Sequence, residues 1–284
     1  MQPISTNPLA KHFRQPAIYF KLPSRGAYWP DSTIEIPLTG EIPVFPMTTR
    51  DEITIRTPDA LLNGESVVSV IQSCCPNIKD AWKMPSIDVD ATLIAIRIAS
   101  YGQGMDIDTI CPNESCKHEN NHELDLTGLL DRIKSPDYSQ PVEIQNLKIK
   151  LRPQSYFESN RINLTSFEEQ KLMQIANDDS LADEEKLRLY QIHMQKLIGI
   201  NIGIIAAGTE YIETDSGTQV SDQKFIIEFY ENADNKVIKA VRDRFDEYVK
   251  VSALPNSKIQ CEECKMEYPV SITFDYANFF ATAS

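Results

Sequence analysis

Residues 110–126 read ICPNESCKHENNHELDL, and residues 259–274 read IQCEECKMEYPVSITF. Each stretch enters a short cysteine turn from an isoleucine and continues into an alternating pattern typical of a β-strand. Each turn is typical of half a zinc ribbon, so the sequence predicts one tetrahedral four-thiolate site closed by two distant segments. The cysteines of the two turns are Cys111, Cys116, Cys261 and Cys264.

The spacings within the turns, C-x-x-x-x-C and C-x-x-C, both fall within the range of zinc knuckles. Disulfides are the alternative, which a reducing compartment disfavours. His118 and His122 follow the first turn, and either imidazole could replace a thiolate as a ligand. Because four cysteines complete a closed structural site, we expect a structural zinc and solvent-exposed turn histidines outside the ligand set.

Cys74 and Cys75 are cysteines of another kind, because they stand side by side at the end of an apolar run over residues 67–82. Neighbouring side chains on a helix point in different directions, so the two thiols cannot easily chelate one metal. We expect them to be buried structural thiols.

Composition restricts the function classes. The chain has 284 residues, and 41 acidic against 28 basic side chains give a net charge of −13. Such a surface repels phosphate backbones, which disfavours broad electrostatic binding to nucleic acid. Neither a signal peptide nor an apolar window of membrane-spanning length is apparent, so we expect no membrane partner and synthesis in a reducing cytoplasm.

The motifs predict an α+β fold with an N-terminal mixed strand/helix region, a split zinc ribbon and a helical insertion. Within this plan, the insertion hangs between the two halves of one ribbon. The predicted segments are an extended N-terminal arm (1–20), an α+β domain with the first knuckle (21–153), a helical insertion (154–255) and the second knuckle (256–284).

Two hairpins are expected from alternating segments. Residues 32–38 and 41–47 alternate with period two around a Thr-Gly pair, and they predict the first hairpin. The segment VEIQNLKIKLRP (142–153) predicts the second, with its turn at Asn146.

Helix boundaries are expected from capping residues and breakers. An apolar helix is predicted over residues 89–102 and a long helix over residues 181–208. The further expected signals are Thr48 with Asp51, Pro58 and Gly64 around a short helix, Ser166 with Glu169, Ser221, and Asp234.

The loop KLPSRGAYWP (21–30) is the other unusual segment. Arg25 stands in a Pro/Gly frame beside Tyr28 and Trp29. Arginine and aromatic residues together are typical of interface anchors, so these three residues are predicted to bind a partner. The alternative is that Tyr28 and Trp29 cover the core beneath the first hairpin, and the two roles can coexist.

No catalytic constellation is recognisable: the sequence has no nucleophile elbow, phosphate-binding glycine loop or metalloprotease motif. We therefore expect no enzyme and no small-molecule substrate. A zinc-ribbon nucleic-acid-binding or regulatory protein is the alternative, but glutamates outnumber lysines around both turns. An enzyme with an unrecognised site is a third reading.

The order of motifs resembles the baseplate protein family of T-even-type contractile-tailed bacteriophages. The shared pattern runs from LPSRG (22–26) through the proline-rich strands and the ATLIAIRIASYG helix (91–102) into a cysteine turn, with a terminal C-x-x-C. The first turn, C-x-x-x-x-C, is wider than the family's C-x-x-C. The resemblance implies a hub subunit or hub assembly protein of the tail baseplate, with other phage tail proteins as partners and the virion as location.

Overall fold

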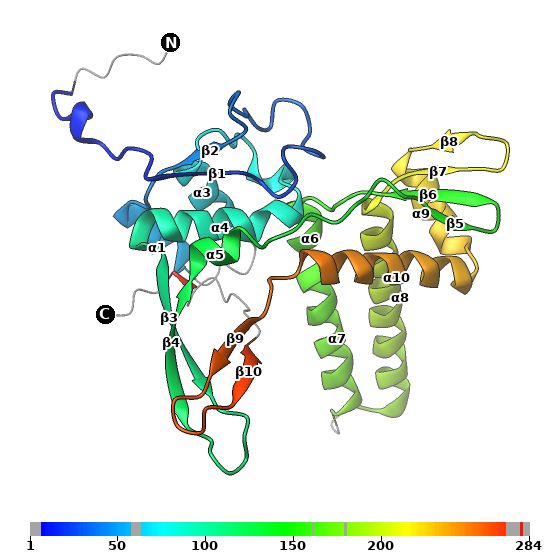
Figure 1. Ribbon diagram of the computed structural model, residues 1–284. Helices are drawn as coiled ribbons and strands as arrows, with labels where there is room; N and C mark the ends of the chain where they lie inside the picture. Colours follow the sequence, from blue (N-terminus) through cyan, green and yellow to red (C-terminus); the bar gives the residue numbers. More distant parts are fainter. Residues whose placement is uncertain (1–6, 58–63, 161, 179–180, 271–278, 281–284) are drawn as a thin grey trace. The chain divides into compact units, whose positions relative to one another are not determined.

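The computed structural model describes residues 7–57, 64–160, 162–178, 181–270 and 279–280 (Figure 1). Its mixed helices and small sheets confirm the α+β part of the predicted fold class. The chain divides into two compact units. The first unit contains Met1–Ala81, Asp88–Ile133 and Leu254–Ser284, and the second contains Trp82–Ile87 and Lys134–Ala253.

The first unit is built around a buried helix. The helix α4 (Ser86–Tyr101), which enters this unit at Asp88, is apolar on nearly all sides, and Leu93, Ile94 and Ile96 are fully buried. A helix of this composition is stable only when neighbours surround it. The other elements of the unit are α1 (Thr49–Ile55), α3 (Glu65–Cys74), α5 (Leu126–Leu130), β1 (Ile18–Phe20), β2 (Ile42–Val44), and the strands of two further hairpins described below.

Local signals at the ends of these helices are confirmed. Thr48 and Asp51 form a reciprocal capping box at the start of α1. The helix α4 ends at Tyr101, and Gly102 follows with a φ of +95°, where a glycine is favoured. The short helix predicted between Pro58 and Gly64 falls on residues 58–63, which lie outside the described residues.

The first predicted hairpin is wrong. The strand β2 pairs antiparallel with β1, with Ile18 opposite Val44, rather than with residues 32–38. Ile34 instead forms an isolated bridge with Ile78, and the carbonyl of Thr33 accepts a hydrogen bond from the Lys79 amide. Strands of three residues interrupted by prolines carry little information about their partner, so tertiary contacts decide the pairing.

The N-terminal arm is attached to the first unit over part of its length. Residues Ala10–His12 form a 3₁₀ turn, and Ile18–Phe20 are the strand β1. Between them, the Arg14 guanidinium donates hydrogen bonds to the carbonyls of Pro46 and Ser73. The described part of the arm is therefore anchored from Arg14 onward.

The second unit is a four-stranded antiparallel sheet with helices. The sheet order is β5–β6–β7–β8, α9 contacts β7, and α10 contacts β5 (Figure 1). Its strands are β5 (Val142–Ile144), β6 (Leu147–Leu151), β7 (Thr209–Glu213) and β8 (Gln219–Val220). Its helices are α6 (Tyr156–Asn160), α7 (Ile162–Ala176), α8 (Asp183–Ala207), α9 (Gln223–Asn232) and α10 (Asn235–Ser252). A 3₁₀ turn at Ala81–Lys83 spans the point of the chain where the first unit passes into the second.

The β5–β6 hairpin is confirmed at Asn146, where Gln145 and Asn146 both have positive φ, as a tight hairpin turn requires. The expected helical insertion (154–255) also contains β7 and β8, which complete the sheet that β5 and β6 begin. The four predicted segment boundaries stay a prediction.

The caps in the second unit were predicted with mixed success. Asp234 caps α10 as expected, since its side chain accepts from the Lys236 amide. Asp222 rather than Ser221 caps α9. Ser166 is no cap, because α7 already begins at Ile162. None of the described helices combines the length and apolar character needed to cross a membrane.

Candidate metal centre

Two β-hairpins lie side by side (Figure 1), and their turns bring the four cysteines together. The strand β3 (Gly104–Ile110) pairs with β4 (Glu119–Asp125), and β9 (Ser257–Gln260) pairs with β10 (Glu267–Val270). Each cysteine turn connects the two strands of one hairpin. The alternating burial along β4 is the pattern predicted from the sequence, whereas β3, before the turn, was not predicted.

The two turns have the same backbone design. The amide of Cys111 donates to the carbonyl of His118, and the amide of Cys261 donates to the carbonyl of Met266, both at 2.9 Å. The residue after the second cysteine of each turn, Lys117 or Lys265, has a positive φ of 47° or 59°. This left-handed residue returns the chain from the turn into the next strand.

The sulfur atoms form one compact group. Cys111 Sγ lies 3.6 Å from Cys264 Sγ, and Cys116 Sγ lies 3.8 Å from Cys261 Sγ. All four sulfurs lie within 4.8 Å of one another. A tetrahedral zinc site with Zn–S bonds of about 2.3 Å separates its sulfurs by about 3.8 Å. The four cysteines could therefore bind a metal ion, and the thiol cluster fits tetrahedral coordination.

The acid–base chemistry of the cluster also fits a cation. Burial acts to raise the pKa of Cys261, but backbone N–H groups of Cys264 and Glu263 lower this pKa to about 6. Burial and the neighbouring thiols raise the pKa of Cys111 to about 12. Cys261 thus ionises readily, whereas Cys111 stays protonated. A bound divalent cation would favour the thiolate form of both side chains.

The histidines after the first turn do not belong to the sulfur group. Neither His118 nor His122 is among the clustered metal-ligand side chains of the described residues. Both are half-buried rather than exposed. The backbone carbonyl of His118 accepts the hydrogen bond that closes the turn, while its imidazole lies outside the sulfur group.

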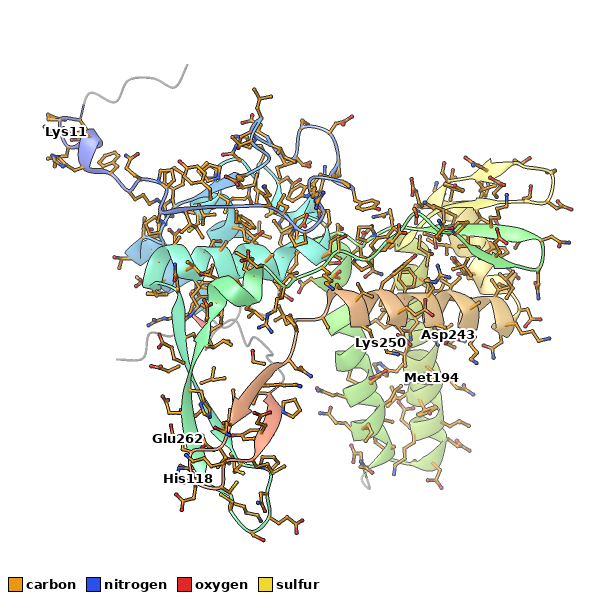
Figure 2. All side chains as sticks on the ribbon, viewed as in Figure 1. Lys11, His118, Met194, Asp243, Lys250 and Glu262 are labelled. Carbon is orange, nitrogen blue, oxygen red and sulfur yellow. The ribbon has the colours of Figure 1, made fainter. Side chains whose placement is uncertain are left out.

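Asn120 and Tyr268 connect the two hairpins, and neither was predicted from the sequence. The amide Nδ2 of Asn120 donates to the His118 carbonyl at 3.0 Å, and its Oδ1 accepts from the Glu262 amide at 2.8 Å. His118 and Glu262 lie near each other at the turn ends of the hairpins (Figure 2). Buried Asn120 thereby fixes one turn relative to the other.

Tyr268 continues this network inside the ribbon. Its ring is buried and lies in one cluster with Cys111 and Cys261. Its hydroxyl is 2.9 Å from Thr109 Oγ1 and accepts from Asn120 Nδ2 at 3.2 Å. Hydrogen bonds around a thiolate group orient the ligands that hold a metal. The only sequence signal for these residues is their position beside the cysteine turns.

The loop of residues 21–30 lies elsewhere in the first unit and is secured by a buried carboxylate. Asp88 accepts hydrogen bonds from the Ser24 amide at 2.8 Å, the Ser24 hydroxyl at 2.5 Å and the Trp29 indole at 2.8 Å. Burial raises the pKa of Asp88 to about 6. The sequence alone does not reveal this partner, because 59 residues separate Trp29 from Asp88.

The predicted partner-binding residues differ in their surroundings. Arg25 is exposed, has a φ of 54°, and makes no ion pair within the described residues. Tyr28 is 43% exposed, whereas Trp29 is half-buried and bonded to Asp88. Trp29 therefore holds the loop in place, and Arg25 and Tyr28 of the same loop are exposed to solvent.

Cys74 and Cys75 are confirmed as buried thiols, since both are fully buried at the end of α3. Burial raises the pKa of Cys74 to about 12, so the thiol stays protonated.

Comparison with known protein families gave one match. A family model described as T4 bacteriophage base plate protein matches residues 29–281, which span both units. Comparison with curated proteins and with solved structures gave no match. The family match confirms the resemblance seen in the sequence.

Proposed function

Because the chain belongs to the family of T4 bacteriophage base plate proteins, we propose that it is a subunit or assembly factor of the baseplate hub. The match over most of the chain carries this proposal. Membership in a structural family indicates a non-catalytic role in the virion tail and contacts with other tail proteins. The position in the hub and assembly in the host cytoplasm go beyond the family match and are part of our proposal.

We further propose that Cys111, Cys116, Cys261 and Cys264 hold a structural zinc as a split ribbon. The sulfur separations and the network around Asn120 support this assignment. A bound zinc would supply metal–sulfur bonds that keep the two hairpins together. Four cysteine ligands fill a tetrahedral zinc site and leave no position for a substrate. The proposed role of the zinc is therefore to stabilise the fold.

The zinc proposal is tested by metal analysis of protein purified without added metal and kept reduced. We expect about one zinc per chain, as for a four-cysteine site. The Cys264→Ser chain should lose the metal, whereas Ser115→Ala, a change of an exposed residue in the same region, should keep it. Zinc-free reduced protein with an intact ribbon would refute the assignment.

Arg25, Tyr28 and Trp29 are proposed to contact a neighbouring tail protein. The support is a loop held by Asp88 that leaves an arginine without an ion pair and an exposed tyrosine. A loop fixed before binding loses little conformational entropy on docking. Arg25→Glu should therefore reduce tail assembly, while Arg242→Glu, at an exposed arginine of the second unit, should not.

The baseplate role is tested with a phage that lacks this protein and is complemented by plasmid-encoded variants. Wild-type protein should restore contractile tails, and mass spectrometry of purified virions separates a resident subunit from a transient assembly factor. We expect removal of residues 1–12 to impair assembly while the anchor at Arg14 and the strand β1 remain. Normal tails assembled with the chain that lacks residues 1–12 would show that this segment has no role in assembly. Salt-sensitive DNA binding would instead favour the nucleic-acid alternative.

A further inference from the structure

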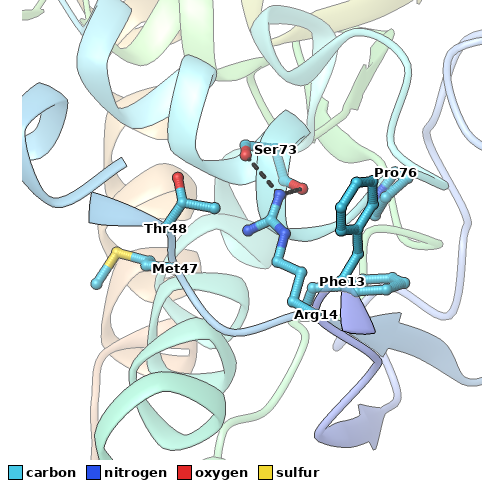
Figure 3. Close-up of a pocket in the computed structure, with 7 residues that line it drawn as sticks. Phe13, Arg14, Met47, Thr48, Ser73 and Pro76 are labelled. Carbon is cyan, nitrogen blue, oxygen red and sulfur yellow. Dashed lines mark hydrogen bonds between the residues drawn. The ribbon is translucent and has the colours of Figure 1, made fainter. Parts of the chain in front are cut away.

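A pocket of about 500 Å³ opens beside the N-terminal arm in the first unit (Figure 3). Its apolar walls come from Phe13, Phe45, Met47 and Pro76. Phe13 is 54% exposed, although it lies next to the anchored Arg14. The volume of the pocket lies in the range of about 300–1,000 Å³ that is typical of ligand pockets.

The position of the pocket is fixed by Arg14. Its Nη1 donates to the Pro46 carbonyl at 2.7 Å and to the Asp51 carboxylate at 3.2 Å. Its Nη2 donates to the carbonyl and the hydroxyl of Ser73, both at 2.8 Å (Figure 3). Asp51 in turn belongs to the capping box of α1. The pocket is therefore preformed, which lowers the entropic cost of filling it.

Two exposed basic residues flank the pocket-lining residues along the chain of this acidic protein. Lys11 and Arg50 stand within two chain positions of a lining residue, and the Asp51 carboxylate that contacts the lining residues Arg14 and Thr48 is already paired with Arg14. Lys11 and Arg50 are exposed and form no ion pair among the described residues. Residues 1–30 contain no acidic residue at all, although the chain carries a net charge of −13.

We propose that this pocket binds an aromatic side chain presented by an acidic segment of another tail protein. The apolar walls fit the ring, which can contact the face or edge of Phe13 and Phe45. Carboxylates on either side of the ring complement Lys11 and Arg50 and speed the encounter. Only the identity of the partner as a tail protein rests on the proposed function.

The test uses the full chain and a fluorescein-labelled peptide in which one phenylalanine is flanked by glutamates. Fluorescence anisotropy should show binding that weakens when lysines replace the glutamates or alanine replaces the phenylalanine. Phe13→Ala should weaken binding about tenfold, as for a central aromatic contact. Lys11→Glu should weaken it about threefold and reduce its salt dependence.

Matched controls come from exposed residues outside the pocket. Leu38→Ala and Lys224→Glu should leave peptide binding unchanged, and all variants should keep the thermal stability of the wild type. Equal binding of the three peptides, or insensitivity to Phe13→Ala, overturns the proposal. Preference for a short oligothymidylate overturns it in favour of nucleic acid. Self-association that Phe13→Ala abolishes would assign the pocket to a second copy.

Phage complementation separates this proposal from the baseplate role. If the acidic peptide binds as expected but Phe13→Ala chains assemble normal tails, the ligand chemistry stands and the tail-protein partner is wrong. If Phe13→Ala blocks assembly while the peptides bind equally, the arm acts in assembly and the acidic aromatic ligand is wrong.

Discussion

At the residue scale, Asp88 determines whether the loop of residues 21–30 has a fixed conformation. Its carboxylate accepts three hydrogen bonds from Ser24 and Trp29 while it is fully buried. A buried carboxylate stays in a protein when its lone pairs are satisfied in this way. The presentation of Arg25 and Tyr28 thus depends on a residue that a partner need not touch.

This carboxylate makes the stability of the loop depend on pH near 6. Burial raises the pKa of Asp88 to about 6 from its ordinary 3.8. Protonation therefore favours the folded state, so its contribution to stability is full below pH 3.8 and is lost as the pH rises through about 6. We expect the indole N–H signal of Trp29 in ¹H–¹⁵N NMR spectra to titrate near pH 6.

Two comparisons check the assignment of this titration. The indole signal of Trp82, which stacks on Tyr156 in the second unit, provides an internal reference. Asp88→Asn should abolish the titration of the Trp29 signal. A Trp29 titration that persists in Asp88→Asn would assign it to another group.

Asn120 has the corresponding role in the ribbon. Asn120→Ala removes the acceptor of the Glu262 amide and one of the two donors to the His118 carbonyl, in a partly buried site. We expect a loss of about 2 kcal/mol in the free energy of unfolding of the first unit, measured by chemical denaturation. Asn121→Ala is the matched control, because Asn121 is exposed and bonds only to Asp108 across the hairpin. Equal effects of the two changes would contradict the bridging role.

At the element scale, both cysteine turns contain a lysine in a backbone region that favours glycine. Lys265 has a φ of 59° after the second turn, as Lys117 has after the first. Lys265→Gly should raise the free energy of unfolding by about 0.5–1 kcal/mol, because relief of the left-handed strain exceeds the entropic cost of glycine. Differential scanning calorimetry would show the gain.

The control for this change lies on the neighbouring strand. Lys258 is in β9, opposite Pro269, and its backbone is extended. Lys258→Gly should lower stability by a similar amount, because a strand glycine gains only entropy in the unfolded chain. If both substitutions destabilise, backbone strain at Lys265 is not significant.

Elements governed by local contacts were predictable from the sequence. The Thr48–Asp51 box spans three residues, and the β5–β6 turn is set by Gln145 and Asn146. The partner of β2 was not predictable, because its choice depends on Phe20 and Ile42 reaching the core together. The strand β7 was missed because its pairing with β6 spans the whole α7–α8 hairpin.

The candidate metal centre was predictable for a chemical reason. Thiols in short turns are rare in a reducing compartment unless they bind a metal or stay buried, so the four cysteines stand out. Asn120, Tyr268 and Asp88 do not stand out, because asparagine, tyrosine and aspartate are common and act here through contacts distant in the chain. Their roles follow only from three-dimensional structure.

At the scale of the whole molecule, each compact unit has its own core. The core of the second unit contains Ile149, Ile212 and Val241, and that of the first contains Ile94. Units with separate cores can unfold in separate steps. We expect calorimetry to resolve two transitions, of which only that of the first unit moves to lower temperature when a chelator removes the proposed zinc.

Two matched substitutions identify the transitions. Ile94 and Ile149 are both fully buried, one in each unit. Replacing either with alanine should cost about 2–5 kcal/mol through lost contacts and a residual cavity. Ile94→Ala should move only the chelator-sensitive transition, and Ile149→Ala only the other. A single transition moved by both substitutions would show that the units unfold together.

The discontinuity of the first unit sets an order of events during synthesis. Cys111 and Cys116 leave the ribosome about half a chain before Cys261 and Cys264, and residues 134–253 of the second unit are made in between. The second unit can therefore fold while the first unit is still incomplete. Until Cys261 and Cys264 emerge, Cys111 and Cys116 lack the two thiols that complete the candidate metal centre. Translation speed across residues 134–253 thus determines how long that incomplete intermediate lasts.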